Sequence, residues 1–457
     1  MRTGSTKTRL EILALMLQLG LLLLAGFAPV DEIALASRQQ PSSAATDEQV
    51  LAGAGARIAR YRMGNLIVKV RDARGRQLKD ALVTVEQTRH AFLFGCNIFL
   101  LDATDSSIAQ EAYRDRFSAL FNYATLPFYW GAFEKERGKP QYEKLEMMAR
   151  WCAAHGIITK GHPLIWQEAY PKWAPADADA AIPLLRERVA GIITRYKGLI
   201  NTWDVVNEAN AAADFNNGEG RWVKRDGAAA VVRTALAWAR EAGGASNETL
   251  IYNDYDVGPK NVALLSELAS TNSLPDVIGL QSHMHQETWP LARAWGVCET
   301  FSQFRRPLDF TETTVISGPR RQFNYGGPPL TDWLTTPDGE ARQADYVEKF
   351  YTLLFSHQSV RAITWWDFSD DRAWLGAPSG LLRRDMTPKP AYDKLIYLIR
   401  QKWWTKAAGK TDASGSYQTR AFIGSYRIKV IARGKTRTVS AEVMKNEDGD
   451  TAVTVSF

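Results

Sequence analysis

The chain has 457 residues, of which 45% are hydrophobic and 23% are charged, and its formal net charge is +6. This composition is ordinary for a soluble globular protein and excludes a largely disordered chain. The basic residues are scattered in short pairs and form no long stripe with aromatic residues, so a nucleic-acid partner is not expected.

The N-terminus has the pattern of a secretory signal. Three basic residues precede an uncharged run over residues 12–30, and Ala34-Leu35-Ala36 offers a cleavage site of small residues. The uncharged run is long enough to span a bilayer, so an uncleaved anchor is the alternative. In either case the sequence predicts a targeting segment over residues 1–36 and a secreted or periplasmic protein.

The next part of the chain changes from a mixed to an alternating pattern. Residues 37–64 are rich in Ala, Ser, Gln and Arg, which predicts a leader or a short helix. Apolar and polar residues then alternate over 66–70 and 81–85, with a Gly-containing turn at residues 72–75 between them. This spacing predicts an N-terminal β-hairpin within residues 65–90.

Strand-like runs alternate with amphipathic helical stretches over residues 91–404. Eight such runs are candidate strands, and they lie near residues 91–98, 121–128, 157–165, 201–208, 249–255, 277–284, 307–313 and 362–368. The helical patterns at 142–155 and 182–197 are each followed by Gly, where a helix C-terminus favours it. Eight strand–helix units predict an α/β fold, a (β/α)8 TIM barrel. An open doubly wound sheet is the alternative, but no GxGxxG or GKS/T loop favours it.

The C-terminal residues 405–457 return to alternation, at 426–431 and 451–455, and predict a small all-β unit. Such a short unit has no large core of its own, so we expect it to pack on the barrel or on the hairpin. Three cysteines, Cys96, Cys152 and Cys298, have no CxxC spacing and predict neither a metal site nor a disulfide framework. One disulfide and three buried thiols both remain possible, and we predict no cofactor.

Two candidate strands end in glutamate. Glu208 follows Asn207 at the end of the fourth strand, and Glu312 ends the seventh. In a parallel barrel the C-terminal strand ends form the active site, and the fourth and seventh strands face each other across it. Taken alone, each Glu has a structural alternative, such as capping the next helix. Together they predict the carboxyl pair that glycoside hydrolysis requires, one protonated and one ionised.

Three further strand ends supply polar and aromatic side chains that could contact a sugar. They carry His162 and Trp166, Gln281 and His283, and Trp366. A lone His or Trp is more often structural, but their convergence at the strand ends of one barrel favours a ligand site. The chain also contains 15 Trp and 16 Tyr, and aromatic planes suit sugar rings as well as large cores.

These segments resemble glycoside hydrolase family 10, the family of endo-β-1,4-xylanases, from Phe94-Gly95 to about Trp404. The matching pieces occur in the family's order and are Gly161-His162 to Trp166, Trp203 to Ala209, Asn253-Asp254-Tyr255, Gly279 to His283, Thr311-Glu312, Trp366 with Trp374, and Pro388-Lys389-Pro390-Ala391-Tyr392.

The resemblance implies a retaining, double-displacement mechanism with Glu208 as acid/base and Glu312 as nucleophile. It also implies that Asn207 bonds the sugar 2-hydroxyl and that Gln281 and His283 hold Glu312. No metal and no partner protein are implied.

For the remaining site residues, the resemblance implies contacts with the substrate. His162 and Trp166 should line the subsite on the non-reducing side, while Trp366 and Trp374 should form an aromatic floor and wall. The implied substrate is xylan or a xylo-oligosaccharide.

Two departures from the family's pattern bear on specificity and pH dependence. The second strand has no counterpart of the family's Glu-Asn and Lys-Trp contacts to the second sugar, and offers Phe128, Tyr129 and Trp130 for stacking instead. Thr314 stands where the family has an Asp beside the His of the sixth strand. The alternatives are therefore a hydrolase of another β-linked glycan, or a non-catalytic glycan-binding protein on the same barrel.

Overall fold

We describe the protein from a computed structural model, which describes residues 45–457 except 245, 247, 326 and 446–448. The predicted targeting segment, residues 1–36, and the start of the predicted leader lie outside the described residues. Within the described part of the chain, no helix combines the length and the apolar character needed to cross a membrane.

The described part of the predicted leader is helical. Helices α1 (Asp47–Ala52) and α2 (Ala54–Tyr61) follow one another directly. Thr46 and Gln49 form a capping box at the start of α1, in which each side chain accepts from the other residue's backbone N–H, at 3.3 and 2.8 Å. This reciprocal pairing satisfies two backbone donors that a helix start would otherwise leave free.

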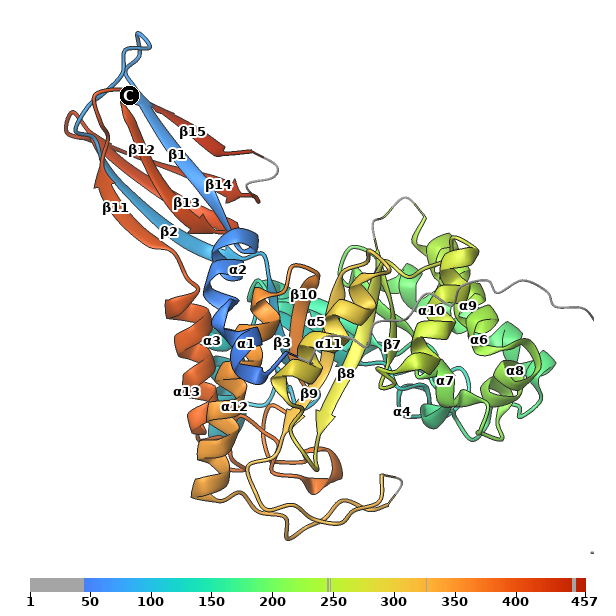
Figure 1. Ribbon diagram of the computed structural model, residues 1–457. Helices are drawn as coiled ribbons and strands as arrows, with labels where there is room; N and C mark the ends of the chain where they lie inside the picture. Colours follow the sequence, from blue (N-terminus) through green and yellow to red (C-terminus); the bar gives the residue numbers. More distant parts are fainter. Residues whose placement is uncertain (1–44, 245, 247, 326, 446–448) are drawn as a thin grey trace, which may run out of the picture. The chain divides into compact units, whose positions relative to one another are not determined.

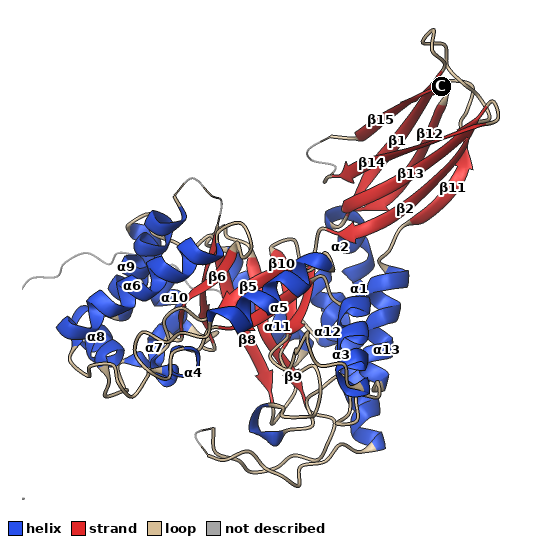
Figure 2. Ribbon diagram, turned by 180° about the vertical axis from the view of Figure 1, so that it is seen from behind, coloured by secondary structure: helices blue, strands red, loops and turns tan. Residues whose placement is uncertain are grey.

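Eight parallel strands close into a barrel, which confirms the predicted fold (Figures 1 and 2). Strand β10 closes the ring by pairing with both β3 and β9. The eight strands overlap the predicted ranges and are β3 (Leu93–Asn97), β4 (Tyr123–Pro127), β5 (Ile158–His162), β6 (Thr202–Asn207), β7 (Thr249–Asp254), β8 (Val277–Met284), β9 (Leu308–Val315) and β10 (Val360–Trp365).

Helices and short helical turns surround the strands. The α-helices are α3 (Ile108–Leu120), α4 (Trp130–Phe133), α5 (Tyr142–Ala154), α6 (Ala178–Tyr196), α7 (Ala209–Ala212), α8 (Gly218–Asp226), α9 (Ala228–Gly243), α10 (Pro259–Ser270), α11 (Leu291–Ser302), α12 (Pro337–Ser356) and α13 (Pro390–Tyr397). The shorter turns are η1 (Gln167–Ala169), η2 (Trp374–Gly376) and η3 (Leu398–Lys402). Gly156 and Gly198 follow α5 and α6 in the left-handed conformation, with φ of 69° and 78°.

The barrel core explains part of the chain's aromatic content. The strands are buried on both faces, as expected when helices cover a parallel sheet. Large aromatic side chains such as Trp203, Trp365 and Trp403 are fully buried in it. All three cysteines are free, buried thiols, so the thiol alternative is the one that the structure shows.

A two-layer β-sandwich lies outside the barrel and combines the two ends of the described chain. One sheet pairs β1 (Met63–Arg71) with β12 (Ser416–Phe422) and β15 (Thr451–Ser456). The other sheet has the order β11 (Lys406–Lys410), β2 (Leu82–His90), β13 (Gly424–Ala432) and β14 (Lys435–Val443). The C-terminal residues therefore build one sandwich together with residues 63–90.

The predicted N-terminal hairpin is wrong, because β1 and β2 belong to different sheets. The turn itself forms, with Gly75 N–H donating to the carbonyl of Asp72 at 2.9 Å, but the chain then crosses to the other layer. Each strand has one apolar face, and stacking two sheets buries both faces against each other, whereas a lone hairpin would leave its face in water. Val68 and Val85, both fully buried, belong to the core that results.

Candidate active site

All nine predicted site residues line one cavity at the C-terminal ends of the barrel strands. The cavity has a volume of about 460 Å³, and the nine residues are His162, Trp166, Asn207, Glu208, Gln281, His283, Glu312, Trp366 and Trp374. A larger cavity of about 1100 Å³ shares Trp166, Glu208 and Trp374 with it. Glu208 thus lies where two adjoining cavities meet, a suitable place for a group that acts on a bond between two sugars.

The backbone of Glu208 is strained. Its φ of 58° and ψ of 40° are left-handed, which costs a residue other than glycine about 1–3 kcal/mol. Its N–H donates to the carbonyl of Asn253 on the neighbouring strand β7 at 2.8 Å, which holds this conformation in place. The strain occurs where β6 ends and α7 begins, so the turn fixes the direction in which the carboxyl group points.

The carboxyl group of Glu208 is buried and surrounded by amide and indole donors. Gln281 Nε2 and Asn207 Nδ2 lie 2.7 and 3.0 Å from Oε1, and Trp166 Nε1 donates to Oε2 at 3.0 Å. Burial raises the pKa of Glu208 to about 8, and the charge of Glu312 adds to this, while the bonds from Gln281 and Trp166 partly offset it. Glu208 is therefore protonated at neutral pH and can act as a general acid.

Glu312, at 4% exposure, is as buried as its partner, yet its environment favours the ionised form. Asn253 Nδ2 donates to Oε1 at 2.7 Å, and His283 Nε2 donates to Oε2 at 3.0 Å. Burial pushes the pKa of Glu312 up, but the bond from His283 and the nearby His162 and Lys160 outweigh it, so the pKa lies below its usual value. An ionised carboxylate here can act as a nucleophile.

Gln281 lies elsewhere in this network than expected. The resemblance implies that it holds Glu312, but its amide contacts Glu208 instead, and Asn253 donates to Glu312. Asn253 Nδ2 also lies 2.7 Å from Asn207 Oδ1 and so links the two carboxyl groups. Sequence reasoning did not include Asn253 among the site residues, although it lies one residue before the end of the buried strand β7, in register with Asn207.

A buried ion pair, formed by Asp204 and Lys160, holds the ring of His162 in place. His162 Nδ1 donates to Asp204 Oδ2 at 2.7 Å, and Lys160 Nζ lies 2.7 Å from the same oxygen. The other ring nitrogen, Nε2, lies 3.9 Å from Glu312 Oε1. Asp204 and Lys160 are fully buried, so the pair orients the imidazole with little freedom to move. Sequence reasoning missed both residues, although each is a charged residue inside an otherwise apolar predicted strand, which is the signal that could have found them.

Two tryptophans form the aromatic walls of the cavity. The ring of Trp366 lies edge-on to His162 and His283, with centroids 5.4 and 5.8 Å apart. Trp374 packs on His283 at 4.7 Å and remains 37% exposed, which leaves part of its ring free to contact a ligand.

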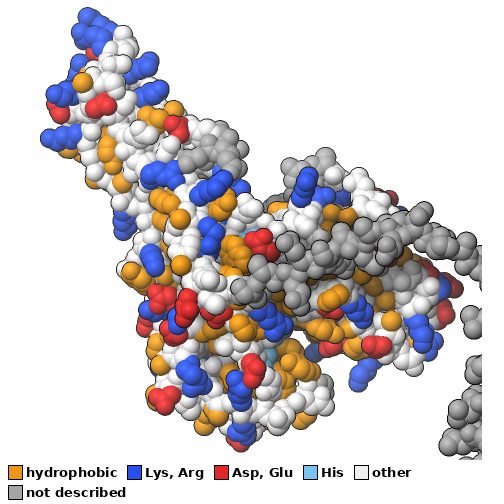
Figure 3. Space-filling view, viewed as in Figure 1, with side chains coloured by type: hydrophobic (Ala, Val, Ile, Leu, Met, Phe, Trp, Pro, Cys, Tyr) orange, Lys and Arg blue, Asp and Glu red, His pale blue; other side chains and the backbone are white. Residues whose placement is uncertain are grey.

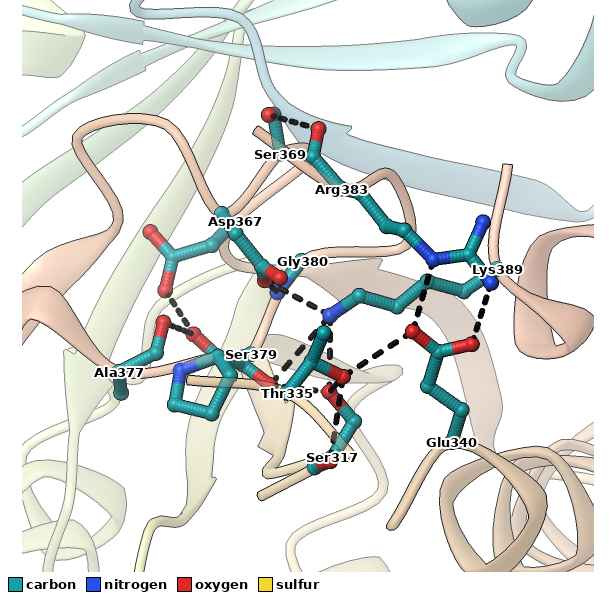
Figure 4. Close-up of polar contacts among 12 residues, drawn as sticks. Ser317, Thr335, Glu340, Asp367, Ser369, Ala377, Ser379, Gly380, Arg383 and Lys389 are labelled. Carbon is teal, nitrogen blue, oxygen red and sulfur yellow. Dashed lines mark hydrogen bonds and ion pairs between the residues drawn. The ribbon is translucent and has the colours of Figure 1, made fainter. Parts of the chain in front are cut away.

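The loop that carries Trp374 is anchored by a buried polar cluster, shown in Figure 4. Asp367 accepts from the backbone N–H of Trp374 at 3.1 Å and from Ser379 Oγ at 2.7 Å. Lys389, fully buried, donates to Asp370 at 2.7 Å and to Ser317 at 2.8 Å, which ties this loop to the end of β9. The described residues contain no group of three or more His, Cys, Asp or Glu side chains that could hold a metal ion.

Residues 87–397 match the family model of glycosyl hydrolase family 10. The chain belongs to this family. Solved family 10 structures share the fold: the xylanase 10B of Thermotoga petrophila RKU-1, in complex with xylobiose, is 22% identical with a TM-score of 0.56, covering 68% of this chain and 95% of that one.

Curated relatives are distant. The anti-sigma-I factor RsgI6 of Acetivibrio thermocellus is 27% identical over 403 residues, and endo-1,4-beta-xylanase 1 of Arabidopsis thaliana is 24% identical over 425 residues. The matches cover 86% and 87% of this chain but only 48% and 40% of those relatives, so the chain spans less than half of their length. Endo-1,4-beta-xylanase B of Thermotoga neapolitana is 25% identical over 288 residues, covering 60% of this chain and 78% of the relative.

The altered second strand of this family 10 barrel offers a single aromatic ring to the cavity. Tyr129 lines it and packs on His162 and on Phe99, at 5.5 and 5.7 Å between centroids. Phe128 and Trp130 are instead buried in the core, so the expectation that all three rings offer stacking is wrong. Consecutive residues at this strand end point in different directions, and only one of them can face the substrate.

Thr314 occupies the position beside His283 that holds Asp in family 10. Its hydroxyl lies 3.3 Å from His283 Nδ1 and accepts from the backbone N–H of Met284 at 3.0 Å. Two other carboxylates of the barrel are engaged elsewhere: Asp309 accepts from Arg361 at 2.9 Å, and Asp367 holds the Trp374 loop. His283 therefore has a neutral hydroxyl as its outer neighbour.

We expect Thr314→Asp to move the acid limb of the pH profile of kcat/KM to lower pH. An anion beside His283 favours its protonated ring, and a positive ring keeps Glu312 ionised in more acidic solution. The measurement is kcat/KM from about pH 3 to 9 on an aryl glycoside. Thr314→Asn, which adds similar volume without charge, is the control. Overlapping acid limbs for the two variants would contradict this account of His283.

The alkaline limb of the same profile should reflect Glu208. Because its pKa is raised to about 8, kcat/KM should stay near its maximum through neutral pH and fall above about pH 8, as the general acid loses its proton. The variant Gln281→Leu tests this assignment. It removes a hydrogen bond that lowers the pKa of Glu208, so the alkaline limb should move to higher pH. An alkaline limb that stays unchanged or moves to lower pH would show that another group determines its position.

Proposed function

We propose that this protein is a retaining glycoside hydrolase that cleaves β-1,4 bonds in xylan or xylo-oligosaccharides. The observation that carries the proposal is the pair of buried carboxyl groups with opposite pKa shifts. The pKa of Glu208, directly after β6, is raised, and that of Glu312, in β9 three strands further around the barrel, is lowered. Such a pair divides the acid and nucleophile roles between two chemically identical side chains. The predicted signal in residues 1–36 supports export of this activity.

In the first step Glu208 donates its proton to the glycosidic oxygen while Glu312 attacks the anomeric carbon from the opposite face. The carbon–oxygen bond to the leaving sugar breaks, and a glycosyl ester with Glu312 forms. The sugar that becomes attached occupies the smaller cavity, and the leaving sugar occupies the larger one on the other side of Glu208.

In the second step Glu208, now ionised, takes a proton from water, which attacks the anomeric carbon and releases Glu312. Two inversions give net retention of the β configuration. Asn207, held by Asn253, lies beside the carboxyl group of Glu208, and we expect it to bond a sugar hydroxyl next to the reacting carbon.

The proposal is tested by incubating the purified protein with xylan, β-glucan, mannan and aryl glycosides and recording the first product by proton NMR. We expect hydrolysis of xylan, with the β anomer appearing before mutarotation. Initial appearance of the α anomer would exclude double displacement. Turnover of another glycan but not of xylan would show that the other glycan is the substrate.

The altered second strand should weaken recognition of the second sugar on the non-reducing side. Each lost charge-assisted bond is worth about 1.5–3 kcal/mol, which is tenfold or more in affinity. We therefore expect kcat/KM for an aryl xylobioside to exceed that for the xyloside by less than about tenfold. Tyr129→Ala should reduce the remaining difference. A much larger preference for the xylobioside would show that other side chains replace the missing contacts.

One relative favours a second candidate function. RsgI6 is named an anti-sigma factor, and its match covers 86% of this chain. A regulatory protein could use the same barrel to bind a glycan without cleaving it. Saturable binding of xylo-oligosaccharides with no product release by the unaltered protein would favour this function over hydrolysis.

A further inference from the structure

A third cavity lies at the opposite end of the barrel strands from the active site, where the barrel contacts the β-sandwich. Its volume is about 400 Å³. The lining comes from residues before β3 and β9 and around the start of β10, together with Arg62 before β1, His90 at the end of β2, and Ile423 and Lys445. This volume is within the range of small-molecule sites. No residue assigned to the hydrolysis lines this cavity.

Among the described residues, the lining of this basal cavity is strongly basic and includes no Asp or Glu. Five of its residues carry a positive charge, and these are Arg62, Arg305, Arg306, Arg361 and Lys445. Arg361 is neutralised by Asp309, with its Nε donating at 2.9 Å. Among the ion pairs of the described residues, none involves the other four. The cavity therefore presents an excess of positive charge.

Arg62 is one of these four basic residues without an ion pair in the described part of the chain. It is 8% exposed, and its guanidinium donates to the backbone carbonyls of Phe355 at 2.6 Å and Val360 at 2.7 Å. Burial lowers the pKa of Arg62 to about 9, so it stays charged at neutral pH. Carbonyl groups satisfy its N–H donors but supply no net negative charge, so an anion nearby would be stabilised.

Arg305 and Arg306 are two further basic residues in the lining of the basal cavity. The Nε of Arg306 is buried without a hydrogen-bond partner in the described structure, and such an unsatisfied donor is costly unless something binds it. Arg305 has a left-handed backbone with φ of 53°. Both residues lie in the turn between α11 and β9.

The net positive charge of the chain is concentrated in the residues that form the β-sandwich. Residues 63–90 and 405–457 contain 15 Lys and Arg against 8 Asp and Glu, whereas the remainder contains 41 against 42. In the view of Figure 3 the face of the sandwich shows many more Lys and Arg than Asp and Glu side chains. A positive surface of this kind raises the local concentration of anions.

We propose that the basal cavity binds a small organic anion, a sugar-sized molecule that carries a carboxylate or phosphate group. Arg306 and Lys445 supply charge-assisted donors for the anionic group. Phe92, Val360 and Ile423 line the apolar part of the wall and contact its carbon skeleton, which favours an organic ligand over a simple ion. This site is separate from the proposed hydrolytic site and does not depend on it.

The test is isothermal titration calorimetry on the full chain at low ionic strength. The probes are digalacturonate for the carboxylate, glucose 6-phosphate for the phosphate, inorganic phosphate, and neutral cellobiose. We expect saturable binding of at least one anionic sugar, weaker binding of inorganic phosphate, and no binding of cellobiose. The anionic sugar that binds identifies the group.

Variants connect binding to the cavity. Arg306→Gln and Lys445→Gln should each weaken binding at least about tenfold, as expected for a lost charge-assisted bond. Lys435→Gln removes an exposed sandwich charge outside the cavity and should leave binding unchanged, and all three variants should cleave xylan as the parent does. Absence of saturable binding, equal binding of inorganic phosphate or cellobiose, or equal losses in the control variant would overturn the proposal.

Discussion

Replacing Glu312 with Gln should lower kcat on xylan by at least about 10⁴-fold, with the fold retained. The amide has nearly the same shape, and its one oxygen can still accept from either His283 or Asn253, but it cannot form the glycosyl ester that the first step requires. The loss should appear on every substrate, including aryl glycosides with good leaving groups, because no leaving group compensates for a missing nucleophile. The measurement is steady-state kinetics on both substrate types.

An added nucleophile, azide, can distinguish a catalytic role of Glu312 from a structural one. In Glu312→Gly, azide should enter the vacated space and attack from the same face, giving the α-glycosyl azide from an activated aryl glycoside. Loss of activity without rescue in any small variant, alongside an altered thermal unfolding profile, would place Glu312 among the structural residues of the barrel.

Replacing Glu208 with Ala should produce a loss that depends on the leaving group. On xylan, where the leaving sugar needs a proton, kcat should fall by about 10²–10⁴-fold. With a dinitrophenyl glycoside the first step needs no proton, so the ester with Glu312 should accumulate and KM should fall together with kcat. The comparison of the two substrates in one variant separates acid catalysis from binding.

Two further results should accompany the Glu208 substitution. The alkaline limb of the kcat/KM profile, assigned to a pKa of about 8, should disappear. Azide should restore turnover and give the β-glycosyl azide, because it attacks the ester formed on the opposite face. Equal losses on both substrates, with the alkaline limb intact, would contradict the acid/base assignment.

The sequence was sufficient for features that depend on local pattern. Alternating strand and helix periods predicted the barrel, and a Glu at the end of a buried strand identified both carboxyl groups, because charge at such a position is costly without a purpose. The ends of all eight strands meet at one face, so the nine predicted residues came together once the fold was known.

Features that depend on contacts between distant segments could not be predicted. Register shifts at Val205 and Thr311 change which side chains of β6 and β9 lie opposite their neighbours, so that Gln281 pairs in register with Glu312 while its amide reaches Glu208. Such bulges leave no mark in a periodicity. The hairpin was mispredicted for a related reason, because the partners of β1 and β2 lie more than 300 residues away in the chain.

The central claim, attack by Glu312 with formation of a covalent ester, is tested most directly by trapping that ester. An aryl 2-deoxy-2-fluoro-xylobioside slows both steps through its electron-withdrawing fluorine, and a good leaving group keeps the first step faster than the second. Mass spectrometry of the intact protein should show one added fluoroglycosyl unit, and peptide mapping should place it on Glu312 and show none in Glu312→Gln. An unlabelled protein that still cleaves xylan, or a label on any other residue, would contradict the account.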